Sequence, residues 1–161
     1  MRKTYITTSI AYVNAEPHIG FLYELLAADV LARYYKLVGH KVFFLTGTDE
    51  HGIKVAQAAA DAGKEPKKFA DELSAKFKEL GEQFDIDFDY FVRTTDEQHV
   101  KFVQEKWRQL DKAGVLKKKQ YGGLYCRGCE SFKHGEEIVG RKSARLSKRS
   151  SPLAMDCGMS P

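Results

Sequence analysis

The chain has 161 residues, of which 43% are hydrophobic and 30% are charged. This composition is typical of a folded globular protein and argues against intrinsic disorder. No apolar run reaches the roughly 18–20 residues that span a bilayer, so we expect no membrane contact. The N-terminus lacks the apolar segment and the small-residue cleavage site of a signal peptide, which favours a cytoplasmic location.

The net charge of +4 arises at the C-terminal end of the chain. Residues 141–161 contain five basic side chains and one acidic side chain, which leaves 21 of each sign in residues 1–140. The balanced part has no basic excess that would favour nonspecific binding to nucleic acid. Residues 141–161 are rich in Ser, Lys and Arg and lack apolar periodicity, so we predict that they are disordered.

The N-terminal part predicts a strand, a helix and a second strand. Thr4–Ile10 is rich in the β-branched residues that favour strands. After a loop at Asn14–Gly20, a helix is expected to reach Val38. Lys41–Thr46 is a continuous apolar run, typical of a strand that is buried on both faces. The helix is expected to bury one apolar face, made of Leu22, Leu25, Leu26, Val30, Leu37 and Val38.

This strand–helix–strand unit predicts a crevice at one edge of a parallel sheet. Residues 9–12 follow the first strand and residues 47–52 follow the second, so both loops lie at the carboxyl edge, where open α/β sheets bind ligands. The first helix also begins there, and its free N–H groups and dipole attract anions. We therefore predict that the phosphates of a nucleotide bind at the start of this helix.

Further elements follow the second strand. Ile53–Ala62 predicts a short helix, and Pro66–Phe84 predicts a longer one because proline is favoured at the first helical position. Residues 90–94 predict another strand. The longer helix carries an apolar stripe that we expect in the core: Phe69, Leu73, Phe77, Leu80 and Phe84.

A last helix is predicted from the capping-box spacing of Thr95 and Gln98 and is expected to reach Ala113. Its apolar residues are expected to face inward, namely Val100, Val103, Trp107 and Leu110. From Val115 onward the composition changes, and a Gly-Gly pair with flanking aromatic residues predicts a small β-hairpin outside the α/β layer.

Four residues near the predicted crevice suit a nucleotide or an amino acid. His18 can donate to a phosphate, and Gly20 leaves room for an adenine ring against the helix. Asp49 can hold an amino group through a charge-assisted hydrogen bond, and Tyr12 can wall an apolar pocket. Each has a plainer alternative, because the histidine and the aspartate can be helix caps, the glycine can relieve a turn and the tyrosine can pack in the core.

Cys126 and Cys129 form a C-x-x-C pair, which is half of a tetrahedral zinc site. The second pair of ligands is not evident, since neither His134 nor Cys157 has the required spacing. Three cysteines without a signal peptide do not suggest a disulfide framework.

Several segments of the sequence occur together in one known family. In chain order they are TTSIAYVN (7–14), PHIG (17–20), VFFLTGTDEHG (42–52), RTTDEQHVKFVQ (93–104) and GLYCRGCESF (123–132). Together they resemble the N-terminal portion of bacterial methionyl-tRNA synthetases, which are class I aminoacyl-tRNA synthetases, over about residues 3–139. The resemblance implies an α/β fold, the first half of a Rossmann-like parallel-sheet catalytic domain of the HIGH-type nucleotidyl transferases.

The resemblance implies an enzyme that activates methionine with ATP and Mg²⁺ and transfers it to tRNA(Met). The HIGH signature of the family, which binds ATP, falls on residues 18–21, with His18 and Gly20 as catalytic residues. The resemblance implies that ATP is bound by Pro17, His18, Gly20 and Phe21. Phe21 stands where the signature has its second histidine.

For methionine, the resemblance implies a second set of residues. Ser9, Ile10 and Tyr12 align with the segment that forms the methionine pocket. Asp49 matches the acid that holds the substrate ammonium. Cys126 and Cys129 match the start of a zinc knuckle in an insertion called the connective peptide.

The resemblance implies that residues 1–114 form the first half of the catalytic domain and that residues 115–140 begin the insertion. Residues 141–161 are the tail. We expect a chain that stops inside the insertion to need a complementing chain for aminoacylation, because a half sheet exposes an apolar edge. The alternative is a non-catalytic module that binds ATP or methionine, or docks on a synthetase. A third hypothesis, another nucleotidyl transferase with a HIGH-type loop, is disfavoured by GTDEHG together with C-x-x-C.

Overall fold

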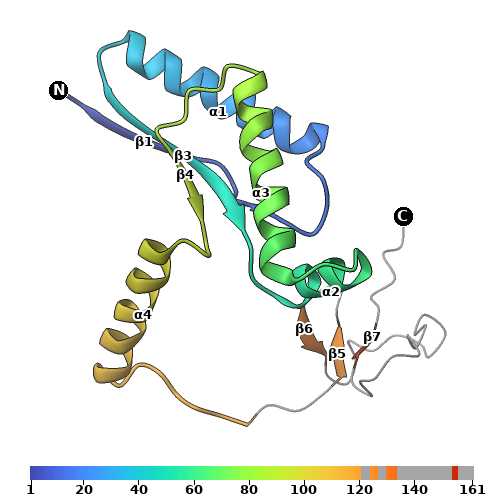
Figure 1. Ribbon diagram of the computed structural model, residues 1–161. Helices are drawn as coiled ribbons and strands as arrows, with labels where there is room; N and C mark the ends of the chain where they lie inside the picture. The colour runs from blue at the N-terminus through green and yellow to red at the C-terminus, as the bar shows by residue number, and fades with distance from the viewer. Residues whose placement is uncertain (121–123, 127–129, 134–153, 156–161) are drawn as a thin grey trace. The chain divides into compact units, whose positions relative to one another are not determined.

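The computed structural model describes residues 1–120, 124–126, 130–133 and 154–155, and the chain divides into two compact units, Met1–Leu110 and Asp111–Pro161. None of the helices in the described ranges is long and apolar enough to cross a membrane. In chain order the elements up to residue 112 are β1 (Lys3–Thr7), β2 (Ala11–Tyr12), α1 (Ile19–Leu37), β3 (Lys41–Asp49), α2 (Ile53–Asp61), α3 (Pro66–Gln83), β4 (Tyr90–Arg93) and α4 (Glu97–Lys112) (Figure 1).

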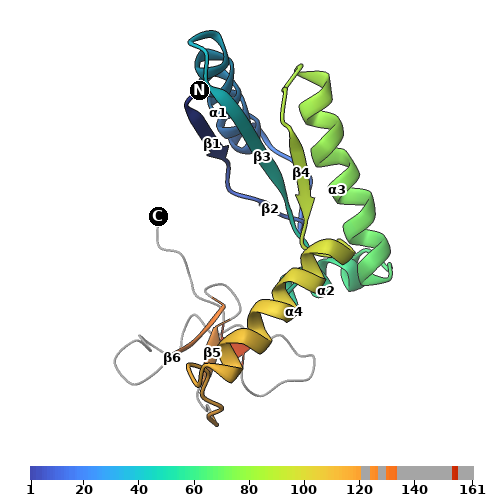
Figure 2. The same ribbon diagram turned by 90° about the vertical axis from the view of Figure 1, so that its left-hand side faces the viewer.

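The sheet is built around β3, and all of its pairings are parallel, as the sequence predicts (Figure 2). Leu45 pairs with Thr7 of β1 and with Tyr90 of β4, which places these two strands on opposite edges of β3. Thr48 pairs in the same way with β2 and β4, so β1 and β2 share one edge. The carboxyl ends of β2, β3 and β4 therefore lie together.

The predicted strand Thr4–Ile10 is wrong in its second half. Thr7 pairs with Leu45 and Ala11 pairs with Thr48, so three residues on one strand lie opposite two on the other. This extra residue is the mark of a β-bulge, which interrupts pairing and redirects side chains. Thr8 still donates its backbone N–H to Leu45, but Ser9 and Ile10 leave the strand.

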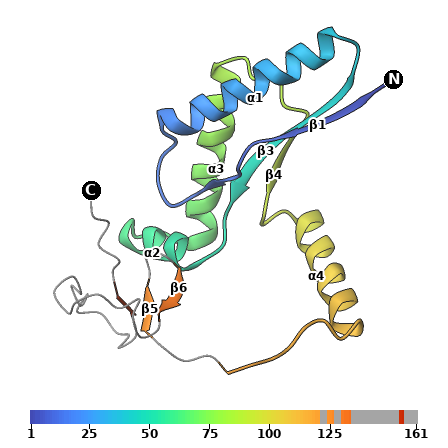
Figure 3. The ribbon, with the colours of Figure 1, turned by 180° about the vertical axis from the view of Figure 1, so that it is seen from behind.

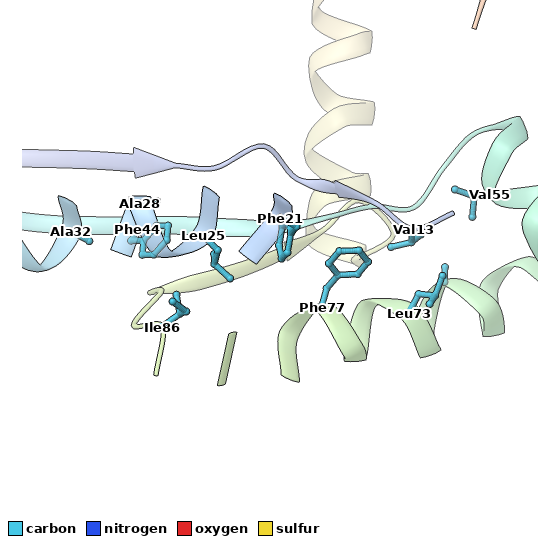
Figure 4. Packing of buried hydrophobic residues seen from close by; sticks show 11 residues of the cluster. Val13, Phe21, Leu25, Ala28, Ala32, Phe44, Val55, Leu73, Phe77 and Ile86 are labelled. Atoms are coloured by element: carbon cyan, nitrogen blue, oxygen red, sulfur yellow. The ribbon is translucent and has the colours of Figure 1, made fainter. Parts of the chain in front are cut away.

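Helices α1 and α3 pack against β3 and against each other (Figures 1 and 3). The alternate β3 residues Phe44, Thr46 and Thr48 are fully buried, as expected for the face of a strand that helices cover. Figure 4 shows the apolar side chains that meet between these elements. The buried cluster consists of Val13, Phe21, Leu25, Ala28, Ala32, Phe44, Val55, Ala70, Leu73, Phe77 and Ile86.

The predicted buried face of α1 is only partly correct. Leu25 is buried, but Val30 is 64% exposed and Leu37 is 86% exposed. The buried face instead includes Asp29, whose carboxylate accepts hydrogen bonds from Arg33 and from the backbone N–H of Asp87. These partners offset the cost of burying a charge, so the helix can be rotated away from its most apolar side.

The predicted α3 stripe is confirmed except at its last member, since Phe84 at the end of the helix is exposed. The prediction that β3 is buried on both faces is wrong. Phe43 is 45% exposed on the face away from the helices and stacks on Tyr5 with ring centroids 5.8 Å apart. Tyr90, in β4, is exposed as well. We call this surface, formed by Tyr5, Phe43 and Tyr90, the open face.

The predicted inward packing of α4 is also wrong within the described residues, because this helix has no buried residue. The predicted capping box does not begin the helix, which starts at Glu97. The hydroxyl of Thr95 donates instead to Glu50. Val103, Trp107 and Leu110 are all exposed.

The second unit contains β5 (Leu124–Cys126) and β6 (Ser131–Lys133), which pair antiparallel as the hairpin prediction requires. A third strand, β7 (Ala154–Met155), pairs parallel with β5. These two residues of the tail are therefore in a strand, contrary to the predicted disorder. The rest of residues 141–161 lies outside the described residues.

The exposure of α4 can be tested with Trp107, the only tryptophan of the chain. Because its side chain is 63% exposed, we expect a fluorescence maximum typical of indole in water and efficient quenching by iodide. Unfolding in urea should move this maximum very little. A blue-shifted, poorly quenched emission would show that α4 is covered in solution.

Candidate functional site

A cavity of about 420 Å³ lies where α1 begins, beside the bulge that separates β1 from β2. It is lined by Ser9, Ile10, Ala11, Tyr12, Asn14, Ala15, Glu16, His18, Gly20, Phe21, Glu24 and Phe77. Six of the eight residues predicted to bind ATP or methionine are therefore brought together, and the other two, Pro17 and Asp49, are not among the lining residues. The cavity occupies the predicted position at the carboxyl edge of the sheet and the N-terminus of a helix.

His18 is the N-cap of α1, and its Nδ1 accepts the backbone N–H of Gly20 at 3.0 Å. The alternative role that the sequence allowed for His18, that of a helix cap, is therefore present in the structure. It does not exclude a role in binding, because a neutral imidazole that accepts at Nδ1 carries its proton on Nε2. His18 is exposed, so this Nε2–H is available as a donor at the helix N-terminus.

Gly20 makes room for the His18 ring in its capping position. A Cβ at this position would lie 2.9 Å from Cε1 of the imidazole, closer than such atoms approach in proteins. The absence of a side chain at Gly20 therefore lets His18 fold back to cap the helix while keeping the cavity open.

Phe21 lies at the floor of the cavity and is only 7% exposed. Its ring meets that of Phe77 edge to face, with centroids 4.9 Å apart (Figure 4). Such a pair is favourable beyond the burial of apolar area. Phe21 therefore offers apolar contact and no hydrogen-bond donor to a ligand.

Glu24 is a cavity residue that sequence reasoning missed. Its carboxylate accepts from the backbone N–H of Ser9 at 2.7 Å and from the Ser9 hydroxyl at 2.7 and 2.9 Å. These bonds tie the bulge to α1 and fix the wall of the cavity. The helical spacing from Gly20 to Glu24, four residues, was the available signal, since such residues lie on one side of a helix.

Asp49 ends β3 and pairs in register with Tyr12. Because side chains alternate along a strand and Thr48 is on the face covered by the helices, Asp49 lies on the other face. The alternative role predicted for Asp49, capping the next helix, is wrong, because Gly52 is the N-cap of α2. Gly52 has φ 113°, and a Cβ there would lie 2.1 Å from the Tyr12 hydroxyl oxygen, so only glycine fits beside Tyr12.

A buried polar network next to Asp49 was also missed. The Glu50 side chain is fully buried and accepts two hydrogen bonds from Arg93, at 2.7 and 2.8 Å, with further bonds from the hydroxyls of Thr48 and Thr95. Arg93 also contacts Asp71 of α3. No local pattern could predict this network, because its members come from β3, α3, β4 and the segment after β4.

The network shifts the ionisation of its members. Burial alone would raise the pKa of Glu50, but hydrogen bonds from Arg93, Thr95 and Thr48 outweigh burial and lower it. The hydrogen bonds that Arg93 donates to Glu50 raise the pKa of Arg93, against the effect of burial. For Asp71, hydrogen bonds from Lys67 and Arg93 lower the pKa. The ion pair is therefore charged at neutral pH.

Pro17, Cys126 and Cys129 are the predicted site residues that remain. Pro17 is half-buried and precedes the cap residue of α1. Cys126 is in β5, whereas Cys129 lies outside the described residues, so the zinc site stays a prediction. Among the residues that the structure describes, no group of three or more metal-ligating side chains comes together.

Comparison with known proteins decides the family. The family model described as tRNA synthetases class I (M) matches residues 4–152. The chain belongs to this family. A methionine–tRNA ligase from Thermotoga maritima is 53% identical over 137 residues, which cover 85% of this chain and 22% of that protein. One from Helicobacter pylori strain J99 is 49% identical over 132 residues, 82% of this chain and 20% of that protein.

Solved structures of the family agree in fold. A structure of Mycobacterium tuberculosis methionyl-tRNA synthetase in complex with methionyl-adenylate has a TM-score of 0.69 and 49% identity, and the match covers 71% of this chain and 22% of that one. The predicted Rossmann-like class I synthetase fold is thereby confirmed. The chain spans about a fifth of the length of these relatives.

Removal of one partner of the Glu50–Arg93 ion pair should destabilise the fold measurably. We expect Glu50→Gln to lower the free energy of unfolding by about 3 kcal/mol in urea titration, since it leaves a largely buried guanidinium without its main partner. The matched control is Glu16→Gln, whose carboxylate pairs with Lys76 at the surface and should change stability by less than about 1 kcal/mol.

The same pair predicts the direction of acid sensitivity. Because the pKa of folded Glu50 is lowered, its contribution to stability is complete above the ordinary carboxyl pKa and is lost as the pH falls through the folded value. The stability difference between wild type and Glu50→Gln should therefore shrink in the acid range below the ordinary glutamate pKa. A difference that stays constant there would contradict the ionised pair.

Proposed function

We propose that the chain provides the ATP- and methionine-binding part of a methionine–tRNA ligase. In this proposal methionine and ATP form methionyl-adenylate and pyrophosphate, and methionine is then transferred to tRNA(Met). The observation that carries it is the cavity that joins the predicted methionine segment, Ser9, Ile10 and Tyr12, to the cap of α1 formed by His18 and Gly20. Homologues about 50% identical are named methionine–tRNA ligases.

The ATP phosphates would bind at the start of α1. There the Nε2–H of His18 provides a donor, and the dipole of α1 favours negative charge. Pro17 leads into this turn, while Gly20 and Phe21 shape the cavity next to it. Mg²⁺ would accompany ATP as part of the substrate.

Methionine would lie between the bulge and the end of β3. Ser9, Ile10 and Tyr12 would contact its side chain, and Asp49 would hold its ammonium group by a charge-assisted hydrogen bond. The amino acid carboxylate would then point toward the phosphates at α1. Such a site works by positioning and charge stabilisation, and it needs no protein nucleophile.

Two features support a binding module that acts with another polypeptide as the second candidate function. The open face carries Tyr5, Phe43 and Tyr90, and α4 exposes Trp107, so a large apolar surface is available for a partner. We propose that a complementing segment of synthetase sequence covers this surface. Zinc binding by Cys126 and Cys129 remains a proposal, which metal analysis of the purified chain would test.

The role of His18 in ATP binding can be separated from its role as a cap. His18→Ala removes both the cap and the Nε2 donor, whereas His18→Ser keeps a capping side chain without the donor. We expect His18→Ser to keep the melting temperature of wild type, and both variants to weaken ATP binding about 10- to 100-fold through loss of a hydrogen bond to a charged group. Calorimetric titration with ATP provides the measurement. Full ATP affinity in His18→Ser would show that the imidazole only caps the helix.

We expect the 161-residue chain by itself to show no methionine-dependent exchange between ATP and pyrophosphate. None of the described residues that line the cavity is a lysine or arginine, and Lys76, which reaches the lining residue Glu16, is held in an ion pair with it. The described lining therefore supplies no cation to stabilise the charge that develops on pyrophosphate. The positive control is a full-length methionine–tRNA ligase under the same conditions. Measurable exchange by the chain alone would overturn this prediction and would favour the catalytic function over the module.

A further inference from the structure

We propose that Glu50 and Arg93 are positioning residues that hold Asp49 at the substrate site. This inference rests on the proposed role of Asp49 in binding the methionine ammonium. It assigns a purpose to a buried ion pair that contacts neither the cavity nor, in the proposed site, the substrate.

The backbone around Asp49 is fixed from both edges of β3. On one edge, the Val13 N–H donates to the carbonyl of Asp49 at 3.1 Å. On the other edge, the Thr94 N–H donates to the carbonyl of Thr48 at 3.2 Å, and the Glu50 N–H donates to the Thr94 hydroxyl at 2.9 Å. The peptide groups that flank Asp49 therefore cannot rotate without losing one of these bonds.

The Glu50 side chain fixes the same point from the buried side. Two parallel bonds between a carboxylate and a guanidinium set orientation as well as distance, which a single contact does not. Arg93 is itself held by Asp71, and so the end of β3 is tied to both β4 and α3. The hydroxyl of Thr48, which bonds to Glu50, also bonds to Ser74 of α3.

Side chains alternate along a strand, so the fixed position of the Glu50 side chain also determines the direction of its neighbour Asp49. Glu50 is the first residue after β3, and its side chain lies on the helix side, where it accepts from the Thr48 hydroxyl that also bonds to Ser74 of α3. Asp49, one residue earlier, lies on the opposite face beside Tyr12. Release of Glu50 would let the chain turn at this point, and the direction of the Asp49 carboxylate would become less defined. A charge-assisted hydrogen bond depends on that direction.

Stability alone is a weak reason for such a pair. The cost of removing two charges from water often exceeds their attraction, and apolar residues of similar size commonly stabilise a protein as well or better. A buried bidentate pair does, however, define a single geometry. This argues that Glu50 and Arg93 serve to define the end of β3, where the site needs one orientation.

A first experiment needs no ligand. In Glu50→Gln, hydrogen exchange should become faster at the amides of Val13 and Thr94, which report the two edges of β3 near Asp49. Amides of α1 far from the site, such as Ala32, should keep the rate expected from global stability. The control is Glu72→Gln. Glu72 lies on the same helix as Asp71, and the substitution removes its surface ion pair with Lys64. Unchanged exchange at Val13 and Thr94 would overturn the proposal.

A second experiment distinguishes positioning from a general structural role. Binding of methionine and of 4-(methylthio)butanoate, which lacks the amino group, is followed by chemical shift changes in wild type, Glu50→Gln, Asp49→Asn and the double variant. We expect Glu50→Gln to weaken methionine binding about tenfold, the scale of one impaired bond to a charged group, and to change binding of the analogue less than about twofold. In the Asp49→Asn background, Glu50→Gln should have almost no further effect, because both act on the same interaction.

The outcomes separate the two proposals. Equal losses for methionine and the analogue, or additive losses in the double variant, would show that Glu50 only stabilises the fold and would overturn the positioning role. If wild type binds neither compound, the methionine site proposed for this chain is wrong. The hydrogen-exchange result then still decides whether Glu50 holds the end of β3.

Discussion

The pairing of β3 with neighbours on both edges is the constraint on which the rest of this structure depends. Because β1 and β2 share one edge and β4 takes the other, all in parallel, the segments that follow these strands meet at one end of the sheet. Only there can the bulge of Ser9 and Ile10, the start of α1 and the end of β3 belong to one site. The Glu50–Arg93 pair secures this arrangement at the point where β3 leaves the sheet.

The start of α1 shows how one residue can have a structural and a functional role together. His18 caps the helix through Nδ1, and this bond determines that the proton is on Nε2, directed away from the helix backbone. Gly20 permits that geometry by leaving space for the ring. The alternatives raised by the sequence, a cap or a ligand donor, are therefore compatible rather than exclusive.

The two faces of the sheet differ because α1 and α3 pack on one of them, whereas the other is bordered only by the first turns of α4 among the described helices. On the covered face, apolar side chains and the satisfied polar groups of Asp29 and Thr48 fill the space between β3, α1 and α3. On the open face, Tyr5 and Phe43 stack in contact with solvent. In a chain that spans about a fifth of its relatives' length, this face is the natural place for further synthetase sequence to pack, as we propose.

The sequence by itself determined the order of the main helices and strands, the parallel sheet and the edge of the sheet at which the cavity lies. Apolar runs and the helix signal at Pro66 depend on residues close together in the chain, and the rule that parallel strands end at one edge then places their loops. The family motifs added Ser9, Ile10, Pro17 and Phe21 to the candidate residues. The error in the predicted strand Thr4–Ile10 also has a local cause, since one extra residue between Thr7 and Ala11 forms the bulge.

Only the tertiary structure decided which faces are buried and which charges are paired. Periodicity favoured Val30 for the core, yet Asp29 is buried there because Arg33 and the 85–87 segment supply its partners. In the sequence, Glu50 is a residue of a predicted loop with no evident partner. In the structure, β4 supplies Arg93, which donates to Glu50, and α3 supplies Asp71, which also accepts from Arg93. The orientation of Asp49 followed from strand register. Burial, pairing and register arise from contacts between residues distant in sequence, and the local pattern of a chain does not contain them.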